Sequence, residues 1–315
     1  MKIYLITSNP SVSDTMKEDL EKLGELAVIN AQKMTAKQVI EKAGDAEIMI
    51  AGPSGIERVS GELLGGLKAL KMIATLSVRV DWIDMATAKD LGITVCNVKG
   101  ANAESVAEHA WALILDLAKR VTEFDRDVRN KGAFKFADYV GKEVYGKTIG
   151  IIGLGDIGSK VARVAEGFDM RVLGYNRSQK KVKAVELVDM ETLLKTSDII
   201  VTTVPLTDQT KGMISDKEIA QMKNGVILVN PAMEAITDAD AVLKGLESGK
   251  IFGFGVETEI MKPVPMDSPY FKHPRVVVTP HNAFNTEDAN RKSYELAVAN
   301  VKAFLSGQPQ NIVSV

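Results

Sequence analysis

Cysteine and long apolar runs are almost absent from this sequence. The chain has one cysteine, Cys96, which excludes an internal disulfide and a multi-cysteine metal site, and no metal site is predicted. No apolar run approaches the roughly 18 residues that a membrane-spanning helix needs. Basic and acidic residues nearly cancel, with 39 Lys and Arg against 41 Asp and Glu and a formal net charge of −2. We therefore expect neither nucleic acid nor a membrane as a partner.

The opening residues, MKIYLITS, have the pattern of a short strand and lack the charged and apolar regions of a leader. Cys96 lies in a strand-like segment, ITVCNV, where a small buried hydrophobe is the simpler interpretation. From these features we expect a cytoplasmic protein.

Strand-length apolar runs alternate with helical patterns along almost the whole chain of 315 residues. The predicted strands are 2–7, 25–29, 47–52, 71–76 and 93–98, then 149–153, 171–176, 198–205, 225–231, 251–257 and 275–281. This alternation predicts an α/β protein with two doubly wound parallel-sheet domains. A long, largely apolar helix over 101–120 is expected to be buried between domains or subunits, and an amphipathic helix over 287–307 to return to the first series.

A glycine-rich turn follows the strand at 149–153 and opens a helix. Its three glycines have the spacing Gly153-x-Gly155-x-x-Gly158, with Leu154, Asp156 and Ile157 between them. In such a turn the first glycine makes the tight bend, the second leaves room for a pyrophosphate, and the third lets the helix pack closely on the sheet. The free N–H groups at the helix start then hold the phosphates. The segment therefore predicts a dinucleotide-binding site.

The residues after the next strand bear on the choice of cofactor. An NAD site usually has an acidic residue about 20 positions after the turn, whereas this chain has Asn176, followed by Arg177 and Ser178. A cation and a hydroxyl suit the 2′-phosphate of NADP(H), so NADP(H) is favoured over NAD(H). The alternative is that these are solvated loop charges.

The order and spacing of five segments resemble the D-isomer-specific 2-hydroxyacid dehydrogenase family from about residue 67 to residue 305. The segments are LKALKMIATLSVRVDWIDMATAKDLGITVCNV, ANAESVAEHA, GKTIGIIGLGDIGSKVA, VPLTDQTKGMI and VVVTPHNA. The resemblance implies a flavodoxin-like substrate domain (1–99 plus 284–315), an inserted Rossmann domain that binds NAD(P) (100–283), an active site at the hinge, and a homodimer formed through the Rossmann domain.

The resemblance also implies which residues contact the cofactor. Carried over by position, they are Val106, Gly155, Asp156, Ile157, Arg177, Pro205, Thr210, Ala232 and Glu257.

Catalysis in the family uses an arginine that holds the substrate's carboxylate, a histidine that donates a proton, and a glutamate that supports the histidine. His281, at the end of the strand in TPH, matches the histidine. Met233 stands at the place of the arginine and Lys262 at that of the glutamate. On the substrate loop, Arg79 replaces a glycine next to Val78, so Arg79 and Lys262 are candidates to hold a substrate anion.

The other two histidines are expected to have structural roles, His109 packed within a helix and His273 in a surface loop. The favoured function is an NAD(P)-dependent oxidoreductase that moves a hydride between nicotinamide and a small hydroxy or oxo acid or a related carbonyl compound, with His281 as the acid and base. The alternative is a catalytically silent NADP(H)-binding sensor or regulatory protein, since two of the family's catalytic side chains are missing.

Overall fold

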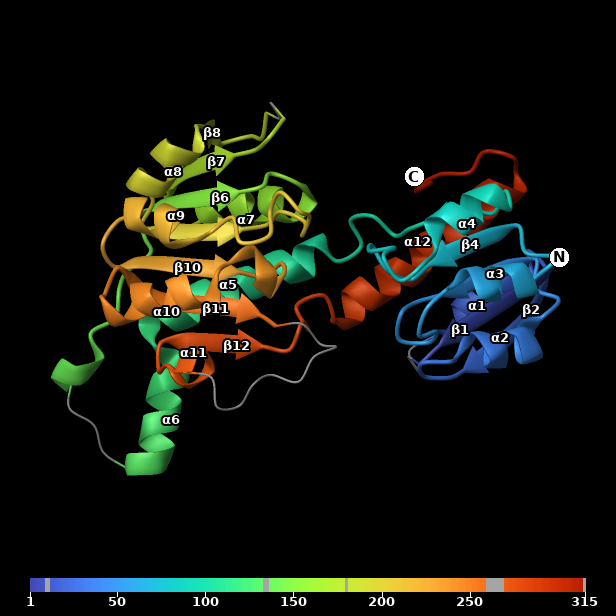
Figure 1. Cartoon of the computed structure of the whole chain (residues 1–315), viewed down its shortest axis with the longest axis horizontal. Helices are drawn as coiled ribbons and strands as arrows, with labels where there is room; N and C mark the ends of the chain where they lie inside the picture. Colours follow the sequence, from blue (N-terminus) through green and yellow to red (C-terminus); the bar gives the residue numbers. More distant parts are fainter. Residues whose placement is uncertain (9–11, 133–135, 179–180, 259–268, 314–315) are drawn as a thin grey trace. The chain divides into compact units, whose positions relative to one another are not determined.

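The computed structural model describes residues 1–8, 12–132, 136–178, 181–258 and 269–313 (Figure 1). The chain divides into two compact units. Unit 1 comprises Met1–Asn102 with Thr286–Val315, and unit 2 comprises Ala103–Asn285.

Unit 1 is built on a five-stranded parallel sheet in the order β2-β1-β3-β4-β5. Its strands are β1 (Lys2–Thr7), β2 (Glu25–Asn30), β3 (Ile48–Ala51), β4 (Met72–Thr75) and β5 (Thr94–Cys96). Its helices are α1 (Asp14–Glu21), α2 (Ala36–Ala43), α3 (Gly61–Gly66), α4 (Met85–Asp90) and α12 (Glu287–Leu305). This strand order is that of flavodoxin-like folds.

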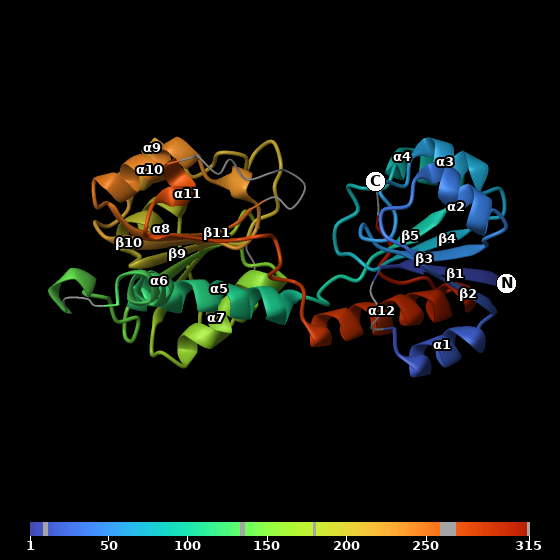
Figure 2. The same cartoon turned by 90° about the horizontal axis from the view of Figure 1, so that it is seen from below.

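Both faces of the unit 1 sheet are covered, because successive side chains of a strand point to opposite faces. Ile48 and Ile50 of β3 face a cluster that includes residues of α1 and α12, and Met49 between them faces α2 and α3 (Figure 2). The return of α12 is fixed by polar contacts too, since the Tyr294 hydroxyl lies 2.9 Å from Thr7 Oγ1. Cys96 is fully buried, and burial raises the pKa of its thiol to about 11, as suits a packing residue.

Unit 2 is built on a seven-stranded parallel sheet in the order β12-β11-β10-β9-β6-β7-β8. Its strands are β6 (Thr148–Ile152), β7 (Arg171–Tyr175), β8 (Glu186–Leu187), β9 (Ile199–Thr202), β10 (Val226–Asn230), β11 (Ile251–Glu257) and β12 (Val276–Thr279). From β6 the chain adds β7 and β8 on one side, and it then crosses to add β9 to β12 on the other. The switch point of this Rossmann order lies between β6 and β9, where α/β sheets bind nucleotides.

Helices cover both faces of this sheet as well (Figure 2). They are α5 (Ala103–Lys119), α6 (Val121–Lys131), α7 (Asp156–Glu166), α8 (Met190–Thr196), α9 (Asp216–Gln221), α10 (Ala239–Glu247) and α11 (Pro269–Lys272), with 3-10 turns η1 (Phe136–Tyr139) and η2 (Glu234–Ile236). The predicted fold class, two doubly wound parallel-sheet domains, is confirmed. Among the residues that the structure describes, no helix combines the length and the apolar character needed to cross a membrane.

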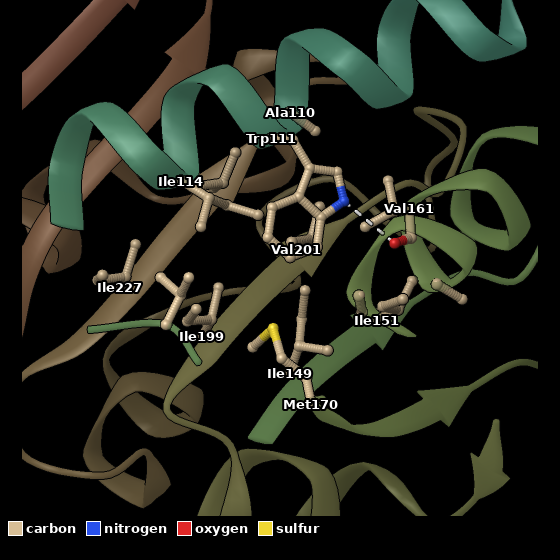
Figure 3. Close-up of a cluster of buried hydrophobic side chains, with 14 of the residues drawn as sticks. Ala110, Trp111, Ile114, Ile149, Ile151, Val161, Met170, Ile199, Val201 and Ile227 are labelled. Atoms are coloured by element: carbon tan, nitrogen blue, oxygen red, sulfur yellow. Dashed lines mark hydrogen bonds between the residues drawn. The ribbon is translucent and has the colours of Figure 1, made fainter. Parts of the chain in front are cut away.

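The long helix α5 packs against β10, β11 and α7 of its own unit. Trp111 fixes its position: the indole Nε1–H donates to the Val161 carbonyl oxygen of α7 at 3.1 Å (Figure 3). The Trp111 ring also stacks on Phe168, with ring centroids 5.1 Å apart. Packing within unit 2 therefore accounts for the apolar pattern that had suggested burial between domains or subunits.

Candidate active site

The glycine turn between β6 and α7 has the geometry that its sequence predicts. Gly153 has a φ of +101°, in the region that favours glycine, and a Cβ there would lie 2.8 Å from Val204 Cγ1. A Cβ on Gly158 would lie 2.0 Å from the Gly153 carbonyl oxygen, so α7 approaches the turn as closely as its backbone allows. A Cβ on Gly155 would meet nothing within 4 Å. The turn is therefore closed at Gly153 and Gly158 and open at Gly155, where a pyrophosphate would need room.

The helix start beside Gly155 offers donors without a side-chain cap. Gly155 is the N-cap of α7, no side chain of the cap accepts a hydrogen bond there, and Asp156 and Ile157 form the first helical turn. The first N–H groups of a helix have no partner within the helix. Together with the space at Gly155, this arrangement fits the phosphates of a dinucleotide.

Asn176 ties the glycine turn to the end of β7. Its Oδ1 accepts a hydrogen bond from the Leu154 N–H at 3.2 Å, and its Nδ2 donates to Ser178 O at 2.8 Å and to Ser178 Oγ at 2.9 Å. The exposed Arg177 lies between these two residues, and its Nη1 donates to Gln209 Oε1 at 3.3 Å. The structure thus places Arg177 and Ser178 beside the turn, on the segment predicted to select the cofactor.

The loop after β9 closes over the other side of the turn. Thr203 Oγ1 donates to the Gly153 carbonyl oxygen at 2.6 Å. Further along, Thr210 Oγ1 donates to the Pro205 carbonyl oxygen at 2.6 Å and accepts from the Thr207 N–H at 2.8 Å. Pro205 and Thr210, both predicted cofactor contacts, therefore belong to one hydrogen-bonded loop.

Asn230, at the end of β10, organises the segment that holds Ala232 and Met233. This buried amide donates from Nδ2 to the Met233 carbonyl oxygen at 2.8 Å, and its Oδ1 accepts from Thr202 Oγ1 at 2.9 Å and from the Ala232 N–H at 3.3 Å. The Met233 side chain is partly exposed. A thioether has neither the charge nor the donors to bind a carboxylate as an arginine does.

His281 follows β12 at the same carboxyl edge of the sheet. It has a φ of +52°, a left-handed conformation that costs a residue other than glycine about 1–3 kcal/mol and persists where its surroundings enforce it. Its N–H donates to the Thr279 carbonyl oxygen at 3.0 Å, and its ring centroid lies 6.1 Å from that of Phe284. The imidazole is partly exposed, as a proton donor to a bound substrate must be.

Glu257, at the end of β11, is engaged by groups of the protein. The side chain is 1% exposed, and its Oε1 lies 3.1 Å from His109 Nε2 and accepts from the Thr279 hydroxyl. Its Oε2 accepts from the Ala283 N–H at 3.0 Å. Burial opposes ionisation of this carboxyl, but the hydrogen bonds from His109, Thr279 and Ala283 outweigh it and hold its pKa below the ordinary value of 4.5.

The contacts of His109 differ from those that its sequence position suggested. It was expected to pack within its helix, and it instead lies beside Glu257 and Thr279, with 24% of its side chain exposed. Ser105, one turn earlier on α5, donates to the Ala283 carbonyl oxygen, so the same helix face contacts both the last residue of β12 and the segment after it. Val106, a predicted cofactor contact, is buried on this helix. The spacing of Ser105 and His109 is the only local signal that could have indicated this polar face.

The residues predicted to bind substrate are Arg79, Val78, Met233 and Lys262. In unit 1, Arg79 is 54% exposed, and its Nε donates to Asp81 Oδ1 at 3.0 Å. The Val78 carbonyl oxygen accepts from Asn97 Nδ2 at 2.8 Å, and the Arg79 carbonyl oxygen accepts from the Trp82 indole at 3.0 Å, so side chains fix the backbone of this loop. Lys262 lies outside the described residues.

The described residues contain no group of three or more His, Cys, Asp or Glu side chains that could hold a metal ion. The Rossmann strand order, the glycine turn open at Gly155 and the uncapped start of α7 define unit 2 as a dinucleotide-binding domain of the kind used by nicotinamide-dependent oxidoreductases.

Comparison with known proteins identifies the family. A family model described as the NAD-binding domain of D-isomer specific 2-hydroxyacid dehydrogenases matches residues 111–283. The chain is 36% identical to a glyoxylate reductase of Korarchaeum cryptofilum (strain OPF8) over 88% of this chain and 86% of that protein. It is 39% identical to a D-3-phosphoglycerate dehydrogenase of Archaeoglobus fulgidus over 74% of this chain and 45% of that longer protein. A solved structure of an acyclic imino acid reductase, Bsp5, in complex with NADPH and D-Arg, superposes with a TM-score of 0.87 at 27% identity and covers 100% of both chains.

The chain belongs to the D-isomer-specific 2-hydroxyacid dehydrogenase family. It is an NAD(P)-dependent oxidoreductase that uses a nicotinamide cofactor and a small-molecule substrate, and the alternative of a silent sensor is not favoured. The resemblance inferred from the sequence motifs is thus confirmed.

Two glycine substitutions should separate the close packing of α7 at Gly158 from the open space for the cofactor at Gly155. Gly158→Ala forces a Cβ against the Gly153 carbonyl oxygen and should lower the free energy of unfolding by about 1–3 kcal/mol. Gly155→Ala should cost no more than about 1 kcal/mol, because its Cβ enters open space, yet it should raise the NADPH dissociation constant about 10-fold or more by filling that space. Urea unfolding and fluorescence titration would measure the two effects. If the two variants lost the same cofactor affinity and the same stability, the result would contradict these separate roles of Gly155 and Gly158.

The lowered pKa of Glu257 predicts how its contribution to stability depends on pH. A carboxyl whose pKa is lower in the folded state stabilises the fold above its unfolded pKa, near 4.5, and the contribution disappears as the pH falls through the lower folded value. Glu257→Gln should therefore unfold at a lower temperature than the native protein at pH 7, and the gap should shrink as the pH falls below 4.5. Thermal unfolding across that range is the measurement, and a constant gap would be the contrary result.

Proposed function

We propose that this chain is an NADP(H)-preferring reductase of small oxo compounds in which His281 is the general acid. The observation that carries the proposal is that His281 and the open glycine turn lie at the carboxyl edge of one sheet, where this class of fold performs its chemistry. When bound, the nicotinamide supplies the hydride.

His281 would hold a proton on its imidazole and give it to the substrate's carbonyl oxygen as that atom gains charge. The reverse reaction would use the neutral imidazole as a base. A positioned acid or base of this kind contributes about 10²–10⁴ in rate.

The substrate's anionic group needs a cation, and Met233 cannot provide it. We propose that Arg79 and Lys262 bind this group in place of the family's arginine, with Val78 and Met233 as uncharged neighbours of the substrate. Arg79 carries a planar guanidinium suited to a carboxylate. Its ion pair with Asp81 is exposed and so contributes little stability, which means that a substrate carboxylate could replace Asp81 at little cost in free energy. Loss of one preorganised charge contact typically costs about 10²–10³ in rate, so ordinary 2-keto acids should be poor substrates unless these cations replace it.

The cofactor contacts that we propose are those carried over from the family other than Glu257, whose buried carboxylate is engaged by protein groups, together with the residues of the glycine turn and the segment after β7. We propose that Arg177 and Ser178 bind the 2′-phosphate of NADP(H), because a cation and a hydroxyl stand there and Asn176 is neutral. The homodimer through the Rossmann unit and the cytoplasmic location stay predictions from the resemblance and the sequence.

A substrate screen tests the proposed reaction. The panel should contain 2-keto acids, aldehydes, other small oxo compounds and imino acids, the last because one solved relative is described as an acyclic imino acid reductase. We expect NADPH oxidation with at least one class, and His281→Ala should lower kcat by about 10²–10⁴. His273→Ala, in a loop before β12, is the matched control and should retain activity. Tight NADPH binding with no turnover of any compound would instead support the sensor.

Removal of the Arg177 charge tests the cofactor preference. Arg177→Ala should raise the NADPH dissociation constant about 10- to 100-fold, the range of one charge-assisted hydrogen bond, and change NADH binding little. Arg171→Ala is the control, because Arg171 starts β7, the strand that precedes Arg177, and pairs with Glu186. Fluorescence titration with both cofactors is the measurement, and an equal loss for NADPH and NADH would argue against contact with the 2′-phosphate.

A further inference from the structure

One buried carboxylate bridges the chain on both sides of His281. Glu257 accepts hydrogen bonds from the side chain of Thr279, two residues before His281, and from the N–H of Ala283, two residues after it. Its two oxygens are divided between these contacts, Oε1 toward Thr279 and Oε2 toward Ala283. The short turn that carries the proposed acid is therefore held at both ends by a single side chain.

The backbone of this turn needs such a restraint. His281 has a φ of +52°, a conformation that side chains other than glycine adopt reluctantly, and its N–H donates to the Thr279 carbonyl oxygen at 3.0 Å. The same carbonyl accepts from the Thr258 N–H at 2.9 Å, which joins the turn to the end of β11. A strained residue of this kind persists when the surrounding contacts over-determine it.

His109 completes the arrangement from a third element. Its Nε2 lies 3.1 Å from Glu257 Oε1 and 3.0 Å from Thr279 Oγ1, so it contacts both the bridging carboxylate and one end of the turn. Ser105, on the same helix, donates to the carbonyl of Ala283 at the other end. A carboxylate that is 1% exposed requires partners that compensate its burial, and His109 is the only side chain among its described contacts that can carry a positive charge.

We propose that His109 and Glu257 are positioning residues that hold the Thr279–Ala283 turn and thereby aim the imidazole of His281. In this role Glu257 acts through the protein, although its place in the family pattern had suggested a contact with the cofactor. The catalytic consequence rests on the proposed function, since it assumes that His281 is the acid, whereas the restraint on the turn does not depend on it.

The histidine content of the chain allows a direct test. There are three histidines, so the imidazole Hε1 resonances of the full-length protein form a spectrum of three signals, and His→Gln variants at 109, 273 and 281 assign them. Glu257→Gln and Thr279→Val should both move the His281 signal and leave that of His273 in place. Thr279→Ser, which keeps the hydroxyl, should restore the native signal.

Kinetics with NADPH and the best substrate give a second readout. Glu257→Gln and Thr279→Val should lower kcat about 10- to 100-fold while the NADPH dissociation constant changes less than about twofold, because orientation of the acid is lost and the nucleotide turn is intact. His109→Gln should act in the same direction, and Thr279→Ser should recover most of the rate.

Glu123→Gln is the matched control for loss of a shielded carboxylate. Glu123 pairs with Arg120 at 2.7 Å in the same unit, with side chains 12% and 15% exposed, and neither residue is among the described contacts of the His281 turn. This variant should lower thermal stability and leave both the His281 signal and kcat unchanged.

The outcomes separate the two proposals. An unmoved His281 signal in folded Glu257→Gln or Thr279→Val would overturn the positioning role, and so would a fall in kcat no larger than that of Glu123→Gln. If Glu257→Gln does not fold, Thr279→Val still decides, because it replaces a hydroxyl with a methyl of similar size. A His281→Ala variant with full activity would overturn the proposed acid, while the spectra would still report whether Glu257 restrains the turn.

Discussion

The close approach of α7 to the end of β6 is the contact on which the functional end of unit 2 depends. Gly158 lies against the Gly153 carbonyl oxygen with no room for a Cβ, and Thr203 from the loop after β9 donates a hydrogen bond to that same oxygen. Three segments thus meet at one backbone atom, at the switch point of the sheet. Gly155 lies between two closely packed positions, Gly153 and Gly158, and a Cβ at Gly155 would still meet nothing within 4 Å. Close packing at these two glycines thus accompanies the open space that a dinucleotide would need.

The carboxyl edge of the unit 2 sheet carries a buried carboxylate, that of Glu257. The acidic group at the end of β11 is buried and shared among His109, Thr279 and Ala283, and the sequence pattern predicts that the uncharged Met233 takes the place of the family's arginine. A buried carboxylate with three donors is costly to disturb and suits a fixed support. In unit 1, the exposed Arg79, which we propose binds the substrate's anionic group, can adjust its side chain to an anion more easily than a buried group can.

Much of the fold followed from local patterns. Runs of apolar residues placed the strands of both sheets, and the three glycines with their flanking strand and helix placed the nucleotide turn. The short strand β8, Glu186–Leu187, escaped prediction because two exposed residues show no periodicity. For Asn176, the sequence predicted a neutral side chain near the cofactor but not its hydrogen bonds to Leu154 and Ser178. Those bonds depend on how the glycine turn folds back on the end of β7.

The sequence by itself determined the class of fold, the family and the position of the glycine turn. Each of these depends on residues that are close together along the chain and act through local backbone geometry. Only the tertiary structure decided the surroundings of His281. His109 and Thr279 are 170 residues apart in sequence, and they meet at Glu257 because α5 packs across β11 beside β12. The physical reason is that a buried charge must find its donors wherever packing brings them, and no local pattern records which distant side chains those will be.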